Sequence, residues 1–576
     1  MRCTVNCAMT VHIERRQPQT QAAGWNWPQQ LHPVLRQVYE RRDIAGPDDL
    51  QTELAGIEPV GSFTVLESAA QLLLEHRARR VVVVGDYDSD GATSTALMVL
   101  CLRAFGFEDV RYFVPDRFAL GYGLSVAAVE RIRELEPSLL VTVDNGISSF
   151  DGVAAARAAG IDVLVTDHHI APERLPQANV IVNPNLPGTQ FRGQHLAGVG
   201  VAFYVLAALG RLLGQAPRVA TWLDLVALGT VADVVRLDRC NRILVEQGLQ
   251  RIRAGHCRPG IAALCERAGV KLPDVTAMTL AFQLGPRLNA AGRLDDMSIG
   301  IECLLADDEN AAAQCAGRLD ALNRSRRELE ATMREQALDI VAGLELEDAE
   351  EDAQRRVHVL SHAQWHEGLV GLIASRVRER SGLPSFAFAP AGTVLKGSGR
   401  SIPGFHLRDA LAEVDALHPG LIDRFGGHAM AAGLSLDTAA LPTFSAALQS
   451  VAARRIDPET LRRVLHSDGE LEPGYLSLDA ACAVRDGGPW GQGFPEPLFD
   501  GVFRIVEWRW LKDVHLRLQL TTDDGRQIEA IAFNSEFTDP RPELPVRIAY
   551  RLSVNDYFDD ARLQLIVEHC TPFLPD

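Results

Sequence analysis

The sequence predicts a multi-domain α/β protein: a parallel sheet covered by helices, a connecting helix, a second α/β domain and a C-terminal β-barrel. From about residue 65, buried strands such as RRVVVVG (79–85) alternate with helical patterns, which is typical of a parallel sheet with both faces covered. A second α/β alternation runs from 356 to 460. From 465 onward, segments with a period of two, such as VHLRLQL, predict short antiparallel strands.

The chain is long enough for about three to five domains. We expect an N-terminal segment (1–60), the parallel-sheet domain (61–304), a connecting helix with a linker (305–355), the second α/β domain (356–464) and the barrel (465–576). The stretch from 305 to 345 is highly charged, has no strand pattern and leads into the acidic run ELEDAEEDAQ. It is either a connecting helix or a solvated surface helix of the first domain.

The expected elements follow from the hydrophobic pattern. In the first domain we expect strands at 79–85, 139–143, 162–166 and 179–182. Helices are expected at 92–105, before the C-cap glycine Gly160, at 196–213 and at 221–234. In the second α/β domain we expect the strands VHVL and SFAFAP on either side of a helix at 368–380. The barrel strands are VHLRLQL, QIEAIAF, VRIAYRLSV and LQLIVEH.

The composition excludes several classes of protein. With 47% hydrophobic and 23% charged residues the chain is not disordered, and no run near 18 apolar residues indicates a membrane helix. A net charge of −18 disfavours a non-specific coat on duplex DNA, although a local basic groove could still bind a polyanion. Only Lys271, Lys396 and Lys512 are lysines, so phosphate contacts would be made mostly by Arg. Ten cysteines without a C-x-x-C pair predict reduced thiols and a cytoplasmic location.

Acidic and histidine side chains follow three of the predicted strands. The strand at 79–85 leads into Asp86, Asp88 and Asp90, the strand at 139–143 into Asp144, and the strand at 162–166 into Asp167, His168 and His169. The carboxyl ends of parallel strands meet at one edge of a sheet, where α/β proteins bind their ligands. We therefore expect these side chains to lie together despite their separation in the sequence.

Such a cluster repels itself unless a cation is bound. Carboxylates with one or two His favour Mn²⁺ or Mg²⁺, and the number of ligands is enough for two ions, an arrangement typical of phosphoester hydrolysis. Alone, Asp144-Asn145-Gly146 would be a simple turn and Asp167-His168-His169 a helix N-cap. Asp233 ends an apolar helical segment, where the helix dipole disfavours an anion. It is either a further metal ligand or a surface residue.

These residues resemble the DHH phosphoesterase superfamily, whose four metal-site motifs match Gly85–Gly91, Val143–Gly146, Asp167–His169 and Gly229–Asp233 in order. Within it the chain is similar to the bacterial single-strand-specific exonucleases from about residue 65 to the C-terminus. The resemblance implies that the parallel-sheet domain is a DHH domain and the second α/β domain a DHH-associated (DHHA1) domain. It further implies that the terminal barrel is an OB-like domain that binds single strands.

The resemblance also implies roles for the acids and histidines. Asp88 and Asp144 would hold one ion. Asp90, Asp144, His168 and Asp233 would hold the other, so that Asp144 bridges the two. Asp86 and His169 would be auxiliary and orient ligands or water. Related pyrophosphatases have a His near the position of Gly85, and its absence here would weaken the first site.

Candidate substrate-binding residues lie in three further segments. By the resemblance, Arg287, Asn289 and Arg293 of GPRLNAAGR would contact phosphates, and Arg400, Ser401 and His428 in Gly-rich turns would bind a phosphate or the 5′ end. Each of these segments could instead be a structural turn. In the barrel, alternation places Trp508 and Trp510 in the core, and His515 and Arg517 on the opposite side, where Arg517 could face DNA.

The function implied is a metal-dependent 5′→3′ exonuclease on single-stranded DNA that releases 5′-mononucleotides in DNA repair and recombination. The implied partners are single-stranded DNA, a single-strand-binding protein and a RecQ-type helicase, with no membrane. One alternative is a small-substrate DHH phosphoesterase acting on nanoRNA, a cyclic dinucleotide or pyrophosphate, although such enzymes are usually shorter. Another is a non-catalytic replication scaffold of the same superfamily, although such a protein would have lost ligands that are complete here.

Overall fold

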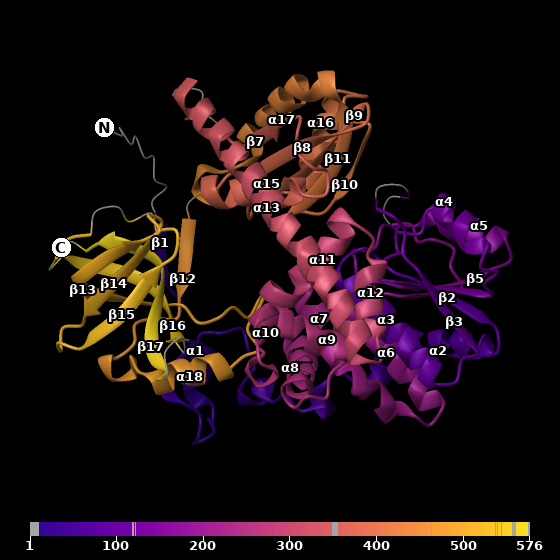
Figure 1. The fold of residues 1–576 in the computed structure, drawn as a ribbon, viewed down its shortest axis with the longest axis horizontal. Helices are drawn as coiled ribbons and strands as arrows, with labels where there is room; N and C mark the ends of the chain where they lie inside the picture. Colours follow the sequence, from indigo (N-terminus) through magenta and orange to yellow (C-terminus); the bar gives the residue numbers. More distant parts are fainter. Residues whose placement is uncertain are drawn as a thin grey trace. The chain divides into compact units, whose positions relative to one another are not determined.

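The computed structural model describes residues 11–117, 120, 123–347, 355–461, 463–535, 537, 540–542, 544–555 and 560–573. The chain forms two compact units (Figure 1). The larger comprises Ile13–Asn323 and His466–Asp576, and the smaller is built on Arg324–Leu465. The predicted parallel-sheet domain and the predicted barrel therefore share one unit, while the predicted domain boundaries stay predictions.

The larger unit contains a five-stranded sheet in the order β3-β2-β4-β5-β6, with all strands parallel. Its strands are β2 (Arg80–Val84), β3 (Asp109–Phe113), β4 (Leu139–Val143), β5 (Asp162–Thr166) and β6 (Val180–Val182). The four expected strands are confirmed. Sequence reasoning missed β3, an edge strand in which Val110 alone is buried, because so little of it carries an apolar pattern.

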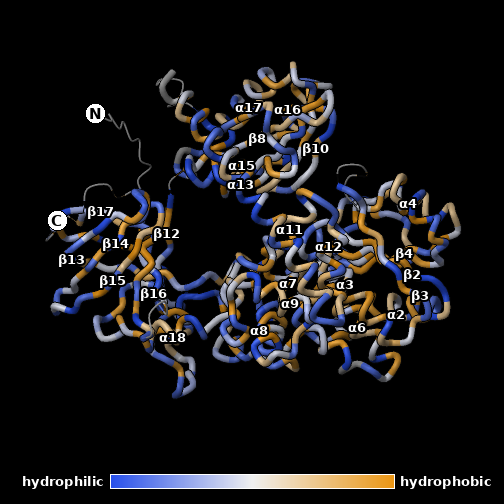
Figure 2. The backbone as a smooth tube through the Cα atoms, viewed as in Figure 1, coloured by the Kyte–Doolittle hydropathy of each residue, from blue (hydrophilic) through white to orange (hydrophobic). Residues whose placement is uncertain are grey.

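Helices cover both faces of this sheet, as the continuous apolar strands predict. Alternate side chains of β2 divide between two cores: Val81 and Val83 pack with one set of helices, and Val82 and Val84 with another. The first face carries α2 (Val65–Glu75), α3 (Ser89–Ala104), α6 (Gly198–Leu212) and α7 (Leu223–Ala232). The second carries α4 (Val126–Arg133) and α5 (Phe150–Ala158) (Figure 1). In Figure 2 the hydrophobic colours accordingly follow β2, β4, α3 and α6.

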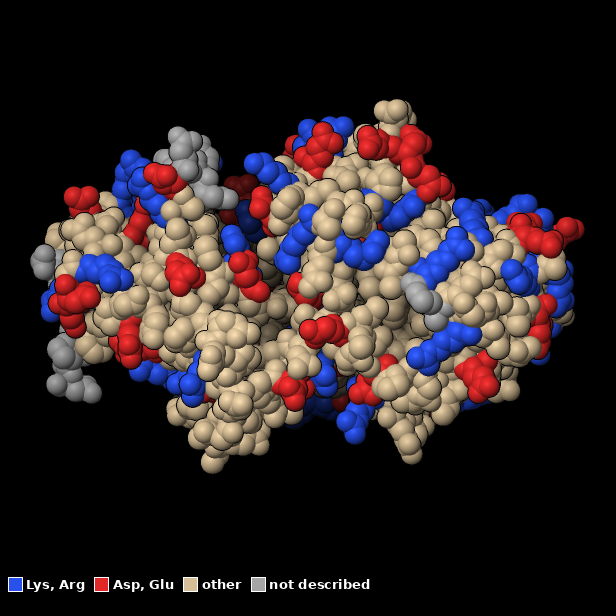
Figure 3. Space-filling model, turned by 90° about the horizontal axis from the view of Figure 1, so that it is seen from below, with Lys and Arg blue, Asp and Glu red and all other residues tan. Residues whose placement is uncertain are grey.

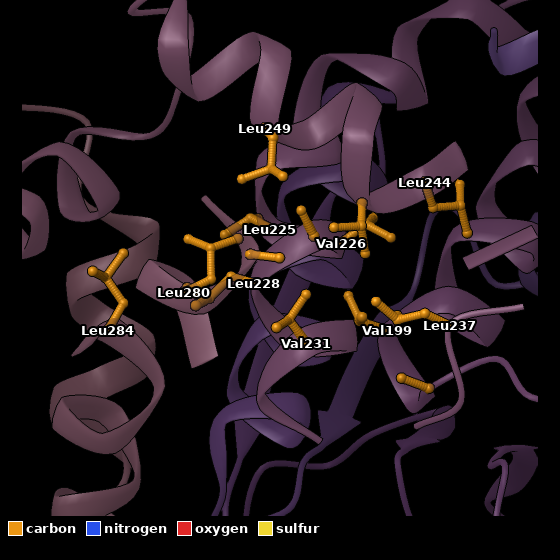
Figure 4. Packing of buried hydrophobic residues seen from close by; sticks show 14 of the residues in the cluster. Val199, Leu225, Val226, Leu228, Val231, Leu237, Leu244, Leu249, Leu280 and Leu284 are labelled. Atoms are coloured by element: carbon orange, nitrogen blue, oxygen red, sulfur yellow. The ribbon is translucent and has the colours of Figure 1, made fainter. Parts of the chain in front are cut away.

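A series of helices continues the larger unit. They are α8 (Arg239–Arg253), α9 (Pro259–Ala268), α10 (Ala277–Thr279), the π-helical turn η7 (Leu280–Leu284), α11 (Gly285–Leu294) and α12 (Ser298–Leu305). Figure 4 shows Leu225, Leu228 and Val231 of α7 in one apolar cluster with Leu280 and Leu284 of η7. The charged stretch forms α13 (Glu309–Glu347), a helix of 39 residues that begins in the larger unit and continues in the smaller.

The smaller unit has a five-stranded sheet in the order β10-β11-β9-β8-β7. Its elements are β7 (His358–Ser361), α15 (Val370–Ser381), β8 (Ser385–Ala391), β9 (Val394–Arg400), α16 (Leu407–Leu417), β10 (Arg424–Gly427), β11 (Ala431–Asp437) and α17 (Leu441–Arg455). The expected α/β organisation is confirmed. Only β7 and β8 are parallel, and the other pairs are antiparallel. Phe386 and Phe388 pack on one face of the sheet, and Ala387 and Ala389 on the other.

The C-terminal strands close into the predicted barrel, in the order β13-β14-β15-β17-β16. They are β13 (Phe499–Leu511), β14 (His515–Thr521), β15 (Gln527–Ala532), β16 (Pro545–Asn555) and β17 (Arg562–Pro572), preceded by β12 (Arg463–Ser467) and α18 (Leu478–Asp486). The prediction that Trp508 lies in the core is wrong, since its side chain is 38% exposed. Trp508 does lie opposite the buried Leu518, as the alternation predicts, but Glu507, Trp508 and Arg509 are all exposed, so this end of β13 extends beyond the core. Trp510 does pack against the core.

The N-terminal segment connects the sheet domain to the barrel within the larger unit. It contains β1 (Val11–Arg15), α1 (Pro33–Tyr39) and several short 3₁₀ turns. On the barrel side, the Tyr39 hydroxyl donates a hydrogen bond to the Gly487 carbonyl over 2.6 Å. On the other side, the Tyr204 hydroxyl of α6 donates to the Glu58 carbonyl over 2.9 Å. The segment is therefore an integral part of this unit.

Charges of both signs are interspersed over the face in Figure 3, where blue and red atoms alternate. This agrees with the argument against a protein that coats duplex DNA through one broad basic face. Within the described ranges, no helix is both long enough and apolar enough to cross a membrane.

Candidate metal centre

The carboxyl edge of the parallel sheet gathers the predicted acids and histidines. Asp86 and Asp88 lie between β2 and α3, and Asp90 lies in the first turn of α3. Asp144 directly follows β4, Asp167, His168 and His169 follow β5, and Asp233 caps the C-terminus of α7. Parallel pairing of β2 with β4 and of β4 with β5 brings the three loops to the same edge. Segments more than 140 residues apart in sequence thus meet at one site.

Helix N-termini hold two of the carboxylates. Asp88 is the N-cap of α3, where its side chain accepts a hydrogen bond from the Gly91 amide over 2.9 Å. Asp90 is fully buried and accepts from the Gly198 and Val199 amides at the start of α6, over 2.6 and 2.9 Å. Two amide donors and the positive end of the helix dipole stabilise its negative charge.

Gly198 makes room for Asp144. A Cβ on this glycine would lie 2.6 Å from the Cβ of Asp144, closer than real atoms approach. Asp144 itself has a φ of +61°, a left-handed conformation that Asp tolerates better than most residues. The close approach of α6 and the special backbone of Asp144 place its carboxylate in the middle of the cluster.

His168 contacts the acids from all three sides. Its Nε2 lies 3.1 Å from Oδ1 of Asp144, 3.5 Å from Oδ2 of Asp233 and 4.0 Å from Oδ2 of Asp90. Asp233, the C-cap of α7, therefore faces the cluster, which favours the interpretation of Asp233 as a metal ligand over that of a surface residue. The geometry brings these predicted ligands within reach of one cation.

Asp167 orients the neighbouring histidine instead of joining the centre. Its carboxylate accepts hydrogen bonds from the Ile147, His168 and His169 amides and lies 2.7 Å from Nδ1 of His169. Although burial opposes it, the charge and hydrogen bond of Asp167 raise the pKa of His169 to about 9. Those same contacts outweigh burial and hold the pKa of Asp167 below its usual range.

The acids of the centre are hard to ionise together. Burial raises the pKa values of Asp86, Asp90 and Asp144 well above the usual range, and the neighbouring carboxylates raise them further. Burial, reinforced by the charge of Asp88, raises the pKa of Asp233 to about 7. Buried acids that oppose each other's ionisation are the electrostatic signature of a site for cations.

The donor set fits divalent cations. Three groups have ligand atoms that all lie within 4.8 Å of one another: Asp90, His168 and Asp233; Asp86, Asp88 and Asp144; and Asp144, His168 and His169. Oxygen donors with one or two imidazoles suit Mn²⁺ or Mg²⁺. The first two groups match the two predicted sites, with Asp144 beside both. Asp86, predicted as auxiliary, lies close enough to be a direct ligand.

Two of the residues predicted to contact phosphates hold the protein together. The guanidinium of Arg287 is buried and donates to Asp320 over 3.0 Å and to the carbonyls of Gln283 and Arg267. Asn289 accepts hydrogen bonds from the amide and hydroxyl of Ser89, over 2.7 and 2.9 Å, at the start of α3. These contacts favour the alternative of structural residues, since Arg287 connects α11 to α9 and α13 and Asn289 connects it to the start of α3.

Sequence reasoning missed a basic rim beside the centre. The guanidinium of Arg117 lies 5.0 Å from the centroid of the Tyr87 ring, between Asp86 and Asp88 in the sequence. The charges of Arg117 and Arg293 both act on the Tyr87 hydroxyl, whose pKa burial nevertheless raises to about 12. Arg293 thus lies near the site as predicted. Arg117 follows an ordinary edge strand, so nothing in its local sequence marks it.

The predicted residues of the smaller unit lie at one end of its sheet. Arg400 ends β9 and donates to the Ser398 hydroxyl over 2.9 Å, close to Gly371 at the start of α15. Ser401 is buried, with its hydroxyl directed to the Phe405 carbonyl. His428 is exposed in the turn between β10 and β11. In the barrel, Arg517 lies 2.7 Å from Glu529 of the neighbouring strand.

The fold and site define a DHH-type protein. The model of the DHH family N-terminal domain matches residues 80–230, that of the DHHA1 domain 354–454 and that of the RecJ OB domain 467–569. Proteins named single-stranded-DNA-specific exonuclease RecJ are similar over almost the full length. The one from Escherichia coli (strain K12) is 45% identical and that from Dickeya dadantii (strain 3937) 47%, with alignments covering 95% and 97% of this chain and 97% and 99% of theirs.

A solved structure agrees with these relatives. The crystal structure of RecJ in complex with Mn²⁺ from Thermus thermophilus superposes with a TM-score of 0.82 at 30% identity, covering 98% of this chain and 80% of that one. The chain belongs to the RecJ family of single-stranded-DNA-specific exonucleases.

Proposed function

We propose that the protein is a 5′→3′ exonuclease that removes 5′-mononucleotides from single-stranded DNA during repair and recombination. The observation that carries the proposal is the buried cluster of Asp90, Asp144, His168 and Asp233 at the sheet edge. The single-strand specificity and the exonuclease activity are those named for the RecJ relatives, whose Thermus thermophilus member has been crystallised with Mn²⁺ and with Mg²⁺. The polarity and the product come from the resemblance.

The residues of the site have different roles in the proposed reaction. Asp88, Asp90, Asp144, His168 and Asp233, with Asp86 nearby, would hold two divalent cations. When bound, such ions lower the pKa of a water molecule and stabilise the negative charge that develops on the phosphoryl oxygens. His169 lies beside the cluster with its Nδ1 2.7 Å from Asp167, which raises the pKa of the imidazole and so favours it as a positive hydrogen-bond donor. Arg117 and Arg293 lie on the adjoining rim, where they can bind a phosphate of the strand.

The two alternatives fit less well. A non-catalytic scaffold would have no need to keep every acid and histidine of the centre, and the set here is complete. A small-substrate phosphoesterase has no need of the closed barrel, which matches the RecJ OB domain and carries the exposed Trp508 and the partly exposed Arg517. Relative rates on a long oligonucleotide and on a dinucleotide would separate the second alternative from the exonuclease.

We further propose a cytoplasmic location, where the substrate lies, and the eight described cysteines are free thiols in keeping with it. A single-strand-binding protein and a RecQ-type helicase are proposed as partners. The rationale is chemical, because a helicase produces the single strand that this enzyme consumes, and a binding protein keeps it unpaired.

The test is digestion of single strands labelled at the 5′ or the 3′ end, with and without EDTA. We expect immediate release of the 5′ label as a mononucleotide, gradual shortening of the 3′-labelled strand, and no product in EDTA. Release of the 3′ label first would contradict the polarity. Cleavage that persists in EDTA would contradict the metal centre.

A further inference from the structure

Three large apolar side chains on segments that form the metal centre, or that pack against those segments, are exposed to solvent. Ile170 is 69% exposed, Phe282 64% and Val234 62%, which makes them the most exposed large apolar residues in the described part of the chain. Ile170 directly follows His169, and Val234 directly follows Asp233. Single exposed apolar residues are common, but several around one polar centre indicate a binding surface.

Phe282 lies close to the same loops although it is distant in sequence. Its neighbours Leu280 and Leu284 in η7 are buried against α7 (Figure 4), so Phe282 is the residue of this turn that is left to solvent. A Cβ on Gly285 would lie 3.1 Å from the Cβ of Ala232, the residue before Asp233. Phe282 precedes Gly285 by about one helical turn, which is about 5 Å along the helix axis. It therefore lies close to the place where this segment contacts Ala232, next to Asp233.

The backbone of Val234 has an unusual conformation. Its φ is +64°, in the left-handed region that β-branched residues rarely adopt, and it is the only β-branched residue with positive φ in the described chain. Strain of this kind persists where the surrounding structure imposes it, and it is concentrated at functional sites. Here it accompanies an apolar side chain that is exposed directly beside a predicted metal ligand.

We propose that Ile170, Val234 and Phe282, here called the apolar rim, contact the bases of the nucleotides next to the bond that is cut, and thereby select single strands. This inference rests on the exonuclease function proposed above. An unpaired base offers a flat apolar face, and stacking on an aromatic ring is independent of sequence because every base has such a face. In a duplex the bases are stacked and paired, so the apolar rim has nothing to bind.

The charged groups and the apolar rim would bind different parts of the strand. The acidic centre with its cations, together with Arg117 and Arg293, attracts the phosphates of the strand. Phosphates alone do not distinguish a single strand from a duplex, because both carry them. Apolar side chains beside the same centre add the contact that only unpaired bases can make.

The experiment uses the full chain and two single strands with a 5′-phosphate. One is an ordinary oligonucleotide, and the other has abasic sugars in place of its first few nucleotides. The variants are Phe282→Ala, Phe282→Trp and the control Leu212→Ala. Leu212 is 50% exposed and ends α6, about 20 Å along the helix from Gly198, whose amide contacts Asp90.

We expect wild type to favour the ordinary strand about tenfold in kcat/KM, the range expected for loss of one stacked base. Phe282→Ala should lose about the same factor on the ordinary strand and little on the abasic one. Phe282→Trp should restore the preference, and Leu212→Ala should behave as wild type. Strand binding measured by fluorescence anisotropy in EDTA should follow the same order.

Three other results would contradict the role proposed for the apolar rim or the exonuclease function on which it rests. An equal loss on both strands would mean that Phe282 meets no base, which overturns the proposal. A change in oligomeric state with unchanged cleavage would assign the apolar rim to a second copy of the chain, and would overturn it too. If wild type cleaves neither strand with Mn²⁺ or Mg²⁺, it is the exonuclease function that fails.

Discussion

The larger unit buries two clusters of carboxylates, and they are built in opposite ways. At the sheet edge, Asp90 and Asp144 lie among other acids with only histidines between them. Beside the barrel, Asp468 and Asp500 are fully buried too, but arginines surround them: Arg42 lies 2.8 Å and Arg16 3.2 Å from Asp468. Both clusters are assembled from segments far apart in the sequence.

The electrostatics of the two clusters differ accordingly. Arg15 and Arg547 each lie 2.9 Å from Asp500, and with the Ser467 hydroxyl they outweigh burial and hold the pKa of Asp500 below its usual range. Burial dominates at Asp468, whose pKa is raised despite its two arginines, and lowers the pKa of Arg42 to about 10. At the metal centre, burial and the repulsion between carboxylates both raise the pKa values of Asp90 and Asp144.

The comparison teaches how to separate a structural cluster from a functional one. The barrel-side cluster supplies its own counter-charges, all from this chain, so it can fix the N-terminal segment to the barrel without a ligand. The sheet-edge cluster is complete only when cations neutralise it. The first should therefore determine stability and the second activity.

The largest effect should come from Asp144→Asn. Asn keeps the size of the side chain and tolerates a positive φ, but it removes the charge between the two predicted cation sites. We expect the exonuclease rate to fall at least about a thousandfold, more than the 10–100-fold typical of a residue that only orients a ligand. The matched control is Asp468→Asn, measured on folded protein, which should keep the rate within about twofold. Equal losses in the two variants would erase the distinction between the clusters.

Arg42→Met should break the other cluster. The Arg42 side chain is 4% exposed and that of Asp468 is not exposed, so the variant leaves a buried charge with one arginine instead of two. We expect the free energy of unfolding of the larger unit to fall by about 3 kcal/mol, the lower end of the range for broken buried pairs. The rate per folded molecule should not change. Chemical denaturation followed by an activity assay at low temperature checks both, and undiminished stability would contradict the role given to the cluster.

The sheet-edge cluster and Asp500 of the barrel-side cluster should make the stability depend on pH in opposite directions. Without metal, the raised pKa values at the sheet edge mean that the native state holds protons that the unfolded state loses near pH 4. Stability therefore falls as the pH rises from about 4 towards the raised pKa of Asp233, which is about 7. The depressed pKa of Asp500 has the reverse sign, so its contribution is present above about pH 4 and is lost on further acidification.

Melting temperatures measured across this pH range check both predicted changes of stability with pH. In EDTA, Asp144→Asn should flatten the decline in stability between about pH 4 and 7, because one repelling acid is gone. Saturating Mn²⁺ should reverse the decline, since only deprotonated ligands bind the ion. Asp500→Asn should be less stable than wild type at neutral pH, and the difference should shrink as the pH falls through the lowered pKa of Asp500. A decline that persists unchanged in Mn²⁺ would contradict the site.

The sequence predicted the sheet-edge cluster better than the barrel-side one, for a physical reason. Acids at the ends of apolar strands can be recognised from the local sequence, and parallel pairing brings the ends of these strands to the same edge of the sheet. Nothing local marks Arg42 and Asp468, which lie 426 residues apart and meet only because the chain folds back. Arg287 shows the same limit: the family resemblance implied a phosphate contact, and its partner Asp320 lies two helices further on, in α13.

The smallest effect concerns an exposed pair on the barrel. Arg517 and Glu529 lie 2.7 Å apart with both side chains partly exposed, so Glu529→Gln should change the stability by less than about 1 kcal/mol. Arg517 was predicted to face DNA, and Glu529 both holds it and repels phosphates. If the prediction is right, Glu529→Gln should tighten single-strand binding several-fold and Arg517→Gln should weaken it several-fold, more so at low salt. Anisotropy titrations at two salt concentrations measure this. Identical affinities for the two variants would contradict a DNA contact by Arg517. The pair would then serve only to connect β14 with β15.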